Sequence, residues 1–356
     1  MFGKSNDRDL GLRAVREIYR RAMIDEEWSI WEDRGFSWWG YRLRQRVWAE
    51  PGVMSRGFRV YRVSIQTDCL RDMEITDAVI GGVGLIARDA AVAAPVLDPE
   101  SGKLFAFTSL YVHEEIFEWA VLKILYPFAV IQLIEAERMA AAGPEVFKTG
   151  TPDYSAHPTS GPRPEPDELL GVIDNLIRPL GRLAPRWPGC EEFPRILDML
   201  NRSNCVATDG GELLTAEFSF GGDTSLLQVD GGAKHRDLGN GALITLKLPL
   251  RWELSAAARL AAEWNRLESR AGTSIHFLGS WAVAEVGDGF SPMFVSFSPA
   301  AVYNPGLAAN LVLTVAARAK WAEDWFGLPG SDVKETVRKR LREFPLREML
   351  SDLKRD

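Results

Sequence analysis

Residues Lys148-Thr-Gly-Thr-Pro-Asp-Tyr-Ser-Ala-His-Pro-Thr-Ser-Gly-Pro-Arg-Pro-Glu-Pro166 divide the chain near its middle. Six of the twenty prolines lie between Pro144 and Pro166, with Gly150 and Gly161 among them and Gly143 directly before. Because proline lacks a backbone N–H and fixes φ, this stretch can neither continue a helix nor enter a central strand. The pattern predicts a semi-extended surface linker over residues 143–166.

The block before the linker, residues 1–142, alternates between helical and strand patterns. Asp9 is placed to cap a helix that runs to about Ile24, with apolar residues on one stripe. Three β-branched or aromatic runs follow, interrupted by glycine turns. The remaining elements expected are a helix at 72–91, a hairpin at 94–112 and a long apolar helix at 113–142.

The block after the linker, residues 167–330, repeats this order behind a short leading helix at 167–180. Its expected elements are a helix at 193–201, strands between 205 and 248, a helix at 254–270, a hairpin at 274–298 and a helix at 307–325. The pattern repeats although little residue identity does. Residues 331–356 predict a separate basic amphipathic helix, which either docks on the second domain or contacts a partner or a membrane surface.

Together these patterns predict an α+β protein with two tandem antiparallel-sheet domains, each of order α-βββ-α-ββ-α, plus a C-terminal helix. A length of 356 residues is enough for two cores. Side-by-side packing of the domains would form an intramolecular pseudo-dimer, and a homodimer is the alternative arrangement.

The composition narrows the function. A net charge of −7 argues against a protein that coats nucleic acid, although a local basic patch is compatible with it. Cys69, Cys190 and Cys205 have no ligand spacing, so a reducing cytoplasm is expected. The first residues contain no apolar signal-peptide core. Residues 116–134 are apolar enough to raise the question of a membrane span, but internal charges favour a buried helix, kinked at Pro127.

The element order resembles the type III secretion chaperone-like fold, a group that includes the YbjN-like bacterial domains. The resemblance covers roughly residues 9–142 and 190–327 and rests on element order and acidic pI, without a diagnostic motif. It implies a bacterial, non-enzymatic protein that binds other polypeptides along its sheet and helix surface. No binding residue can be transferred, because the group has no short motif to match.

The candidate catalytic and ligand-binding motifs of this chain each lack residues that the corresponding site requires. His113 precedes several glutamates but lacks the partner Glu-x-x-His pair of a dinuclear site. Gly81, Gly82 and Gly84 fall inside a helical pattern and so favour close helix packing over a phosphate loop. The Asp-Gly pairs of the second block lack the alternating oxygens of a calcium loop and indicate hairpin turns. We therefore predict no enzyme activity, no cofactor and no metal.

The most distinctive cluster is basic and aromatic and spans residues 34–71, where eight arginines stand against one aspartate and one glutamate. Strand alternation predicts Arg42, Arg44 and Arg46 on one sheet face, interleaved with aromatic rings. Three interpretations stay open: a solvated face, a surface for an acidic protein, or a nucleic-acid surface. The candidate partner-binding residues are Trp38, Trp39, Arg42, Arg44, Arg46, Trp48, Arg59 and Arg62.

These observations lead to one functional hypothesis and one alternative. The chain is expected to be a cytoplasmic, non-enzymatic module, a chaperone, adaptor or regulatory subunit, that binds another polypeptide through exposed tryptophans and a sheet or helix surface. The alternative is a nucleic-acid or nucleotide-binding module that uses the arginine and aromatic face of residues 34–71.

Overall fold

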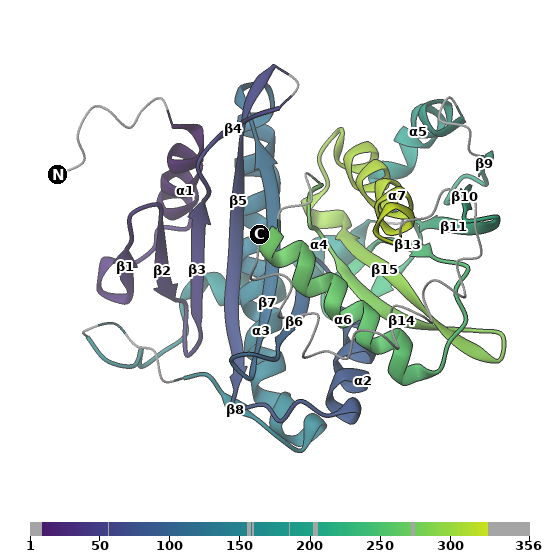
Figure 1. Ribbon diagram of the computed structural model, residues 1–356. Coiled ribbons are helices and arrows are strands. Elements are labelled where there is room, and N and C mark those ends of the chain that lie inside the picture. The colour runs from purple at the N-terminus through teal and green to yellow at the C-terminus, as the bar shows by residue number, and fades with distance from the viewer. Residues whose placement is uncertain are drawn as a thin grey trace.

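The computed structural model describes residues 9–326 except 56, 155–157, 159, 185, 202–205 and 272–274. The predicted C-terminal helix at 331–356 lies outside these residues, as do His157 and Cys205. The protein is α+β, with an eight-stranded and a seven-stranded antiparallel sheet. Figure 1 shows the first sheet upright on the left and the second on the right, with α2 and α6 between them.

The first unit contains three α-helices and its sheet. Its elements are α1 (Leu10–Arg21), β1 (Ser29–Trp31), β2 (Gly35–Trp39), β3 (Arg44–Ala49), β4 (Val53–Ser55), β5 (Phe58–Arg71), α2 (Asp77–Ile86), β6 (Ala94–Asp98), β7 (Lys103–Val112), α3 (Tyr126–Phe147) and β8 (Thr151–Pro152). A 3₁₀ turn, η3 (Ala87–Asp89), follows α2, and a π-helical segment, η5 (Trp119–Leu125), precedes α3.

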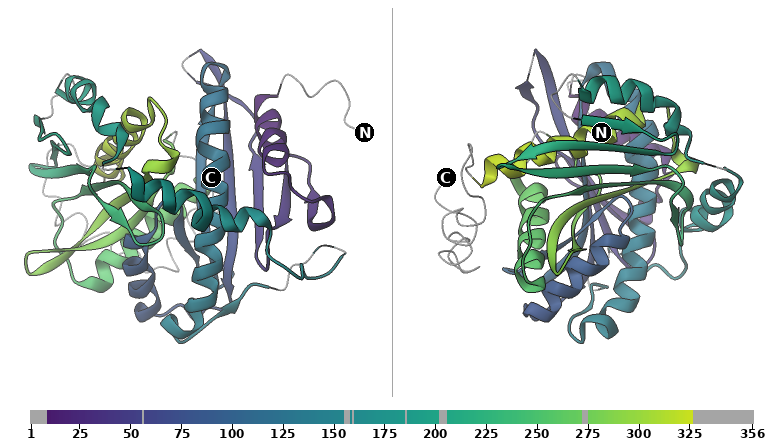
Figure 2. Two further views of the ribbon diagram at one scale, coloured as in Figure 1. Left: turned by 180° about the vertical axis from the view of Figure 1, so that it is seen from behind. Right: turned by 90° about the vertical axis from the view of Figure 1, so that its right-hand side faces the viewer.

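A helical connector leads into the second unit. It consists of η6 (Glu168–Gly171), the π-helical η7 (Ile173–Ile177), α4 (Arg178–Leu183) and η8 (Pro188–Glu192). The second unit follows with α5 (Phe193–Asn201), β9 (Val206–Asp209), β10 (Leu213–Phe220), β11 (Asp223–Asp230), β12 (Lys234–His235), β13 (Gly239–Lys247), α6 (Leu254–Ala271), β14 (Ser280–Val286), β15 (Gly289–Pro299) and α7 (Leu307–Trp325). Figure 2 (left) shows the connector crossing the back of the molecule.

The two sheets have the same topology. Their strand orders are β1-β2-β3-β5-β7-β6 and β9-β10-β11-β13-β15-β14. In both, a meander is followed by a helix and then by a hairpin whose second strand pairs with the last strand of the meander. A short strand, β4 or β12, precedes that last strand in each unit. The predicted α+β class with two sheet-bearing parts is confirmed, and the pattern repeat corresponds to a repeat of topology.

The number of strands before the middle helix differs from the prediction of three. Residues 36–49 form two strands, β2 and β3, because the chain turns at Gly40–Leu43. Glu137 on α3 accepts hydrogen bonds from the backbone N–H groups of Arg42 (2.9 Å) and Leu43 (3.0 Å) and so holds this turn. A Cβ on Gly40 would lie 2.4 Å from Leu133. A tertiary contact with α3 therefore creates a turn that local sequence does not signal.

The first and last helices of the first unit illustrate how sequence and packing combine. Asp9 caps α1 by accepting from the backbone N–H of Leu12 at 3.0 Å, and the stripe of Val15 and Ile18 is buried as expected. Residues 119–147 form one helix long and apolar enough to cross a membrane by length and composition. Most of that helix is buried in the core, which favours the predicted core helix over a span. It changes from π to α geometry next to Pro127.

The linker is shorter than predicted. Helix α3 continues through Pro144 to Phe147, and β8 then pairs with Leu70 and Arg71 at the end of β5. Residues Gly143 to Pro152 thus belong to the first unit. The rest of the predicted linker is anchored at Asp167, whose backbone N–H donates to the carbonyl of Gly40 at 2.7 Å.

The two units pack through equivalent elements. Helix α2 packs on α6, α2 also contacts β14 of the second unit, and α6 contacts β6 of the first. Gly84 on α2 permits this approach, since a Cβ there would lie 3.0 Å from Val283 and 3.4 Å from Ala258. The glycines of α2 therefore lie inside a helix, as predicted. Backbone hydrogen bonds also join the units, among them the reciprocal pair between Ser109 and Phe277 (3.1 and 2.8 Å).

A buried polar network lies beside this junction. The Arg318 guanidinium and the Glu268 carboxylate form an ion pair at 2.5 Å, and both side chains are 1% exposed. Trp281 Nε1 donates to the same carboxylate at 2.6 Å. Burial, followed by the nearby Arg318 charge, lowers the pKa of His276 to about 4. The junction is therefore a continuation of the core, and His276 is a buried wall residue there.

Candidate functional site

The predicted partner-binding set does not form one surface. Trp38 and Trp39 are each 2% exposed, and Trp38 Nε1 donates to Gln45 inside the sheet at 3.0 Å. Of the twelve tryptophans, only Trp31, at 37%, is classed as exposed. The expectation of exposed tryptophan anchors is therefore wrong for Trp38 and Trp39. Their apolar character favoured burial from the start.

Arg62 lies in the junction between the units. Its guanidinium donates to the backbone carbonyls of Glu268 (2.6 Å) and Ser269 (3.2 Å) and to Glu50 (3.1 Å), and the side chain is 3% exposed. An arginine with its donors used in this way is not available to an outside partner. The local sequence pattern that made Arg62 a candidate could not reveal that the second unit covers it.

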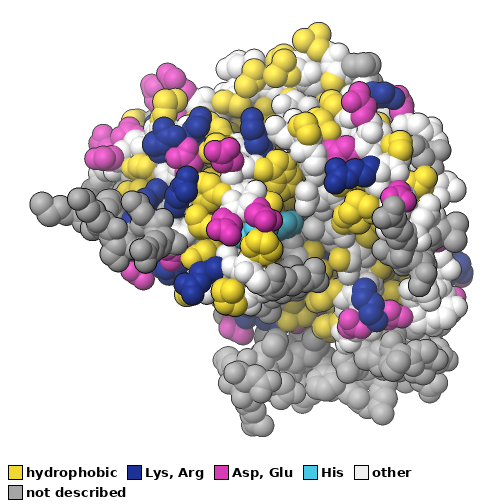
Figure 3. All heavy atoms as spheres, turned by 90° about the horizontal axis from the view of Figure 1, so that it is seen from above, with side chains coloured by type: hydrophobic (Ala, Val, Ile, Leu, Met, Phe, Trp, Pro, Cys, Tyr) yellow, Lys and Arg dark blue, Asp and Glu magenta, His cyan; other side chains and the backbone are white. Residues whose placement is uncertain are grey.

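The other arginines of the set are largely matched by carboxylates. Arg44 donates through two nitrogens to Asp68, at 2.6 and 3.1 Å, and Arg46 pairs with Glu32 at 2.6 Å while lying over the Trp48 ring. Figure 3, a view from above, shows positive and negative side chains next to one another on that side of the molecule. Arg44 and Arg46 are thus engaged by carboxylates of the protein itself.

Arg42 and Arg59 are exposed, but neither joins Arg44 and Arg46. Arg42 lies in the turn between β2 and β3, where its guanidinium stacks on Tyr41 and contacts Tyr154. Arg59 lies on β5 opposite Met54 of the projecting hairpin. The structure separates the eight predicted residues into buried, ion-paired and isolated positions.

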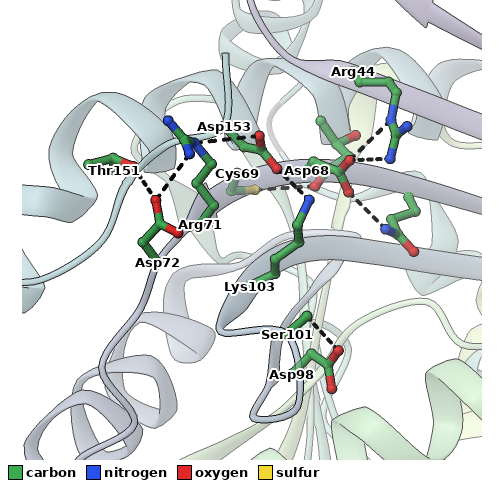
Figure 4. Close-up of polar contacts among 12 residues, drawn as sticks. Arg44, Asp68, Cys69, Arg71, Asp72, Asp98, Ser101, Lys103, Thr151 and Asp153 are labelled. Carbon is green, nitrogen blue, oxygen red and sulfur yellow. Dashed lines mark hydrogen bonds and ion pairs between the residues drawn. The ribbon is translucent and has the colours of Figure 1, made fainter. Parts of the chain in front are cut away.

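A second polar cluster surrounds the end of β5 (Figure 4). Asp153 is buried and accepts from Lys103 Nζ at 2.8 Å, while its backbone N–H donates to the Cys69 carbonyl at 3.0 Å. Arg71 pairs with Asp72 at 3.1 Å, and Thr151 donates to that same carboxylate at 3.3 Å. Each charge in this cluster has a partner. Its role is to fasten the chain after α3 onto the sheet.

Metal and thiol chemistry gain no support in the described part of the chain. No group of three or more His, Cys, Asp or Glu side chains there could hold a metal ion. Cys69 and Cys190 are buried, and burial raises the pKa of the Cys69 thiol far above its ordinary value. A thiol in that state is a poor nucleophile.

A concave region lies where the loop at residues 234–237 of the second unit meets the first. His235 Nε2 lies 3.0 Å from the backbone oxygen of Asp89, and Arg138 on α3 pairs with Asp237 at 2.9 Å. Three adjoining cavities of about 300, 460 and 280 Å³ all include His235 and Arg236 in their walls. Ligand sites commonly form at such boundaries between units.

The cavity of about 300 Å³ has a mixed lining, in which apolar side chains stand beside Asp89, Glu135 and Asp237. Its walls include Met139, Val146 and Phe147, with Glu135 and Arg138 on the same helix. Glu135 accepts from the backbone N–H of Ala91 at 3.2 Å. Burial raises the pKa of Glu135 to about 8; the Asp237 charge adds to the rise, and Arg138 opposes it. This carboxyl is therefore mostly protonated at neutral pH.

The cavity of about 460 Å³, here called the basic cavity, has the opposite character. Its lining contains no carboxylate and consists of Arg178, Arg182, Lys234, His235, Arg236, Gly239 and Asn240. The neighbouring cavity of about 280 Å³ shares three of these residues and adds Arg88.

Two elements distant in sequence build the basic cavity. Gly181 lets α4 lie directly on the β12–β13 hairpin, because a Cβ there would meet the Leu238 carbonyl at 2.8 Å. Arg178 Nε donates to the Asp237 carbonyl at 2.9 Å, and Asn240 donates to the Ala184 carbonyl at 2.6 Å. These bonds place the arginines of the helix beside Lys234 and Arg236.

The basic cavity was not predicted. Arg178 and Arg182 stand one helical turn apart, and Lys234-His-Arg236 forms a second basic group. Either group alone is ordinary on a protein surface. Only the docking of α4 on the hairpin brings the two together.

The outward side of the connector carries an apolar row, here called the leucine row. Leu176, Leu180 and Leu183 follow helical spacing and are 52%, 43% and 79% exposed. Ile177 and Gly181 face inward and are buried. The connector therefore docks on the protein without using these three leucines.

A comparison with known protein families, with characterised proteins and with solved structures finds no match to this chain. The resemblance to the type III secretion chaperone-like fold stays a prediction. What the protein binds is therefore inferred from its own surface.

Proposed function

We propose that this protein is a non-enzymatic binding module, of the chaperone, adaptor or regulatory-subunit kind, that binds another polypeptide on the leucine row. The observation that carries the proposal is the exposure of three leucines at helical spacing on a helix whose inner side already packs on the fold. Burying one such side chain contributes about 1.5–3 kcal/mol. Contiguous exposed apolar rows of this kind mark interaction sites.

The charge around the row indicates the partner's character. From Leu176 to Arg186 the chain contains three arginines and no acidic residue. Arg186 is exposed and makes no hydrogen bond or ion pair within the described part of the chain. An amphipathic helix with an apolar stripe and an acidic margin fits both features, since helices commonly bind through anchors spaced by three or four residues. The proposed partner is a protein that carries such a helix.

The internal pairing of the two units agrees with this proposal. Helices α2 and α6 cover one another, so the junction between the units leaves neither free for an outside partner. The connector lies on the outside of that pair (Figure 2, left). The connector that carries the leucine row therefore lies outside the contact between the two units.

The nucleic-acid alternative has less support on the arginine face. Arg44, Arg46 and Arg62 are committed to Asp68, Glu32 and the second unit. Phosphate contacts would have to replace these ion pairs, which lowers the gain from binding.

The experiment compares two double variants as bait in a lysate of the natural host, read by quantitative mass spectrometry. Leu180→Asp with Leu183→Asp places negative charges in the leucine row, where they would repel the acidic margin of the proposed partner helix. Val53→Asp with Met54→Asp is the matched control, because those side chains are 60% and 66% exposed on β4. We expect mass spectrometry to identify a protein that the wild type and the control retain and that the Leu180→Asp, Leu183→Asp variant does not retain.

The retained protein is then tested directly. Its acidic helix should bind the purified wild type at least about tenfold more tightly than the leucine variant. Unchanged melting temperatures confirm that both variants fold. The same set of proteins on all three baits would refute the leucine row as the binding surface.

A further inference from the structure

The basic cavity concentrates positive charge in a protein whose net charge is −7. Four of its seven lining residues are arginine or lysine, and a fifth is His235. Two carboxylates pair with arginines at the cavity: Asp237 is shared among Arg138, Arg178 and Arg236, and Asp174 pairs with Arg178. Two carboxylates cannot neutralise these three guanidinium groups together with Arg182 and Lys234, so the cavity keeps an excess of positive charge.

Two of the cations have no partner in the described structure. Arg182 and Lys234 are exposed and make no side-chain hydrogen bond or ion pair with any described residue. They come from α4 and β12 and line the same cavity from two elements. Their donors are free to bind an anion.

The other two arginines of the cavity are held by acceptors of the protein. Arg178 donates to the Asp237 carbonyl at 2.9 Å and pairs with Asp174 at 2.5 Å, and Arg236 pairs with Asp237 at 3.2 Å. Their charges add to the positive potential of the cavity, while these donors stay bound to the protein. The cavity thus combines two free cations with two anchored guanidinium groups.

We propose that the basic cavity binds a small molecule through a diphosphate group. Two free cations on two walls, Arg182 and Lys234, supported by the charges of Arg178 and Arg236, match the several oxygens of two linked phosphates better than a single carboxylate. Arginine forks are suited to phosphate geometry, and Lys234 supplies a point charge. A volume of about 460 Å³ accommodates such a group.

The concave shape of the basic cavity favours a small ligand over a long polyanion. The cavity lies between α4 and the β12–β13 hairpin, and Gly181 sets their close approach. A nucleic-acid backbone would instead require a basic stripe that continues over the surface. The neighbouring cavity of about 300 Å³, lined by Met139 and Phe147, shares His235 and Arg236 with the basic cavity and is placed to receive an apolar part of the same molecule.

The test is isothermal titration of the full-length protein with inorganic pyrophosphate at low ionic strength. We expect binding that weakens as salt rises. The double variant Arg182→Ala with Lys234→Ala should bind at least about tenfold more weakly, because it removes two charged donors. Arg195→Ala is the control, since Arg195 is an exposed arginine on α5 outside the cavity.

The other possible results of these titrations also decide whether the diphosphate proposal holds. Pyrophosphate affinity that is equal in wild type and double variant, or undetectable in the wild type at millimolar concentration, overturns it. Citrate carries comparable charge without phosphate, so citrate binding as tight as pyrophosphate refutes the phosphate class. The neutral variant Leu180→Ser with Leu183→Ser removes the apolar side chains of the leucine row without adding negative charge beside Arg182, so it should keep pyrophosphate affinity, which makes this site's failure distinguishable from failure of the leucine row.

Discussion

At the scale of single residues, the protein environment strongly shifts the pKa of the Glu135 carboxyl. Burial raises its pKa to about 8 from an ordinary value of 4.5. The folded protein therefore binds this proton more tightly than the unfolded chain. It follows that the free energy of unfolding falls as pH rises from about 4.5 to about 8 and is then flat with respect to this group.

Replacing Glu135 with Gln should remove this pH dependence. We expect the Gln variant to gain at least about 1 kcal/mol relative to wild type between pH 5 and pH 8.5, because only the wild type must bury a charge at the higher pH. Urea unfolding at both pH values measures the difference. His235, Asp237 and Arg138 are present in both proteins, so their titration largely cancels; parallel pH profiles would contradict the role of Glu135.

At the scale of elements, the contact of α2 with α6 depends on Gly84. A Cβ at Gly84 would meet Val283 and Ala258, whereas a Cβ at Gly81 would meet no atom within 4 Å. Gly84→Leu should therefore destabilise the protein by about 1–3 kcal/mol through overpacking. Gly81→Ala should stabilise it by about 0.5–1 kcal/mol through helix propensity. Thermal unfolding tests both, and equal effects of the two substitutions would contradict the proposed packing.

At the scale of the whole molecule, the two units share one core. Residues of both sheets belong to a single buried apolar cluster, and backbone hydrogen bonds cross the junction. We expect the units to unfold together, with equal calorimetric and van't Hoff enthalpies. Two resolved transitions would show that the units are independent.

Disrupting the buried ion pair between Glu268 and Arg318 makes the unfolding experiment a sharper test of the shared core. Glu268→Gln leaves the Arg318 charge buried without its carboxylate and should cost about 3–5 kcal/mol. If the core is shared, the single transition shifts as a whole. A shift confined to one part of the molecule would instead localise the pair's effect to the second unit.

Much of the fold could be predicted from local pattern. Asp9 caps α1 as expected, the glycines of α2 lie inside a helix, and the order of helices and strands repeats across the chain. The division of residues 36–49 could not be predicted, because Glu137 and Leu133, far along the chain, impose that turn. The predicted basic and aromatic surface of residues 34–71 does not form, because strand alternation does not tell which side chains the core or the second unit will cover.

By itself, the sequence determined the α+β class and the presence of two sheet-bearing parts, because helix caps, residue periodicity and proline act locally. Only the tertiary structure decided which arginines are paired, that Trp38, Trp39 and Arg62 are buried, and that Arg178 and Arg182 face Lys234 and Arg236. Burial and charge pairing depend on residues hundreds of positions apart meeting in space. A local pattern carries no information about such encounters.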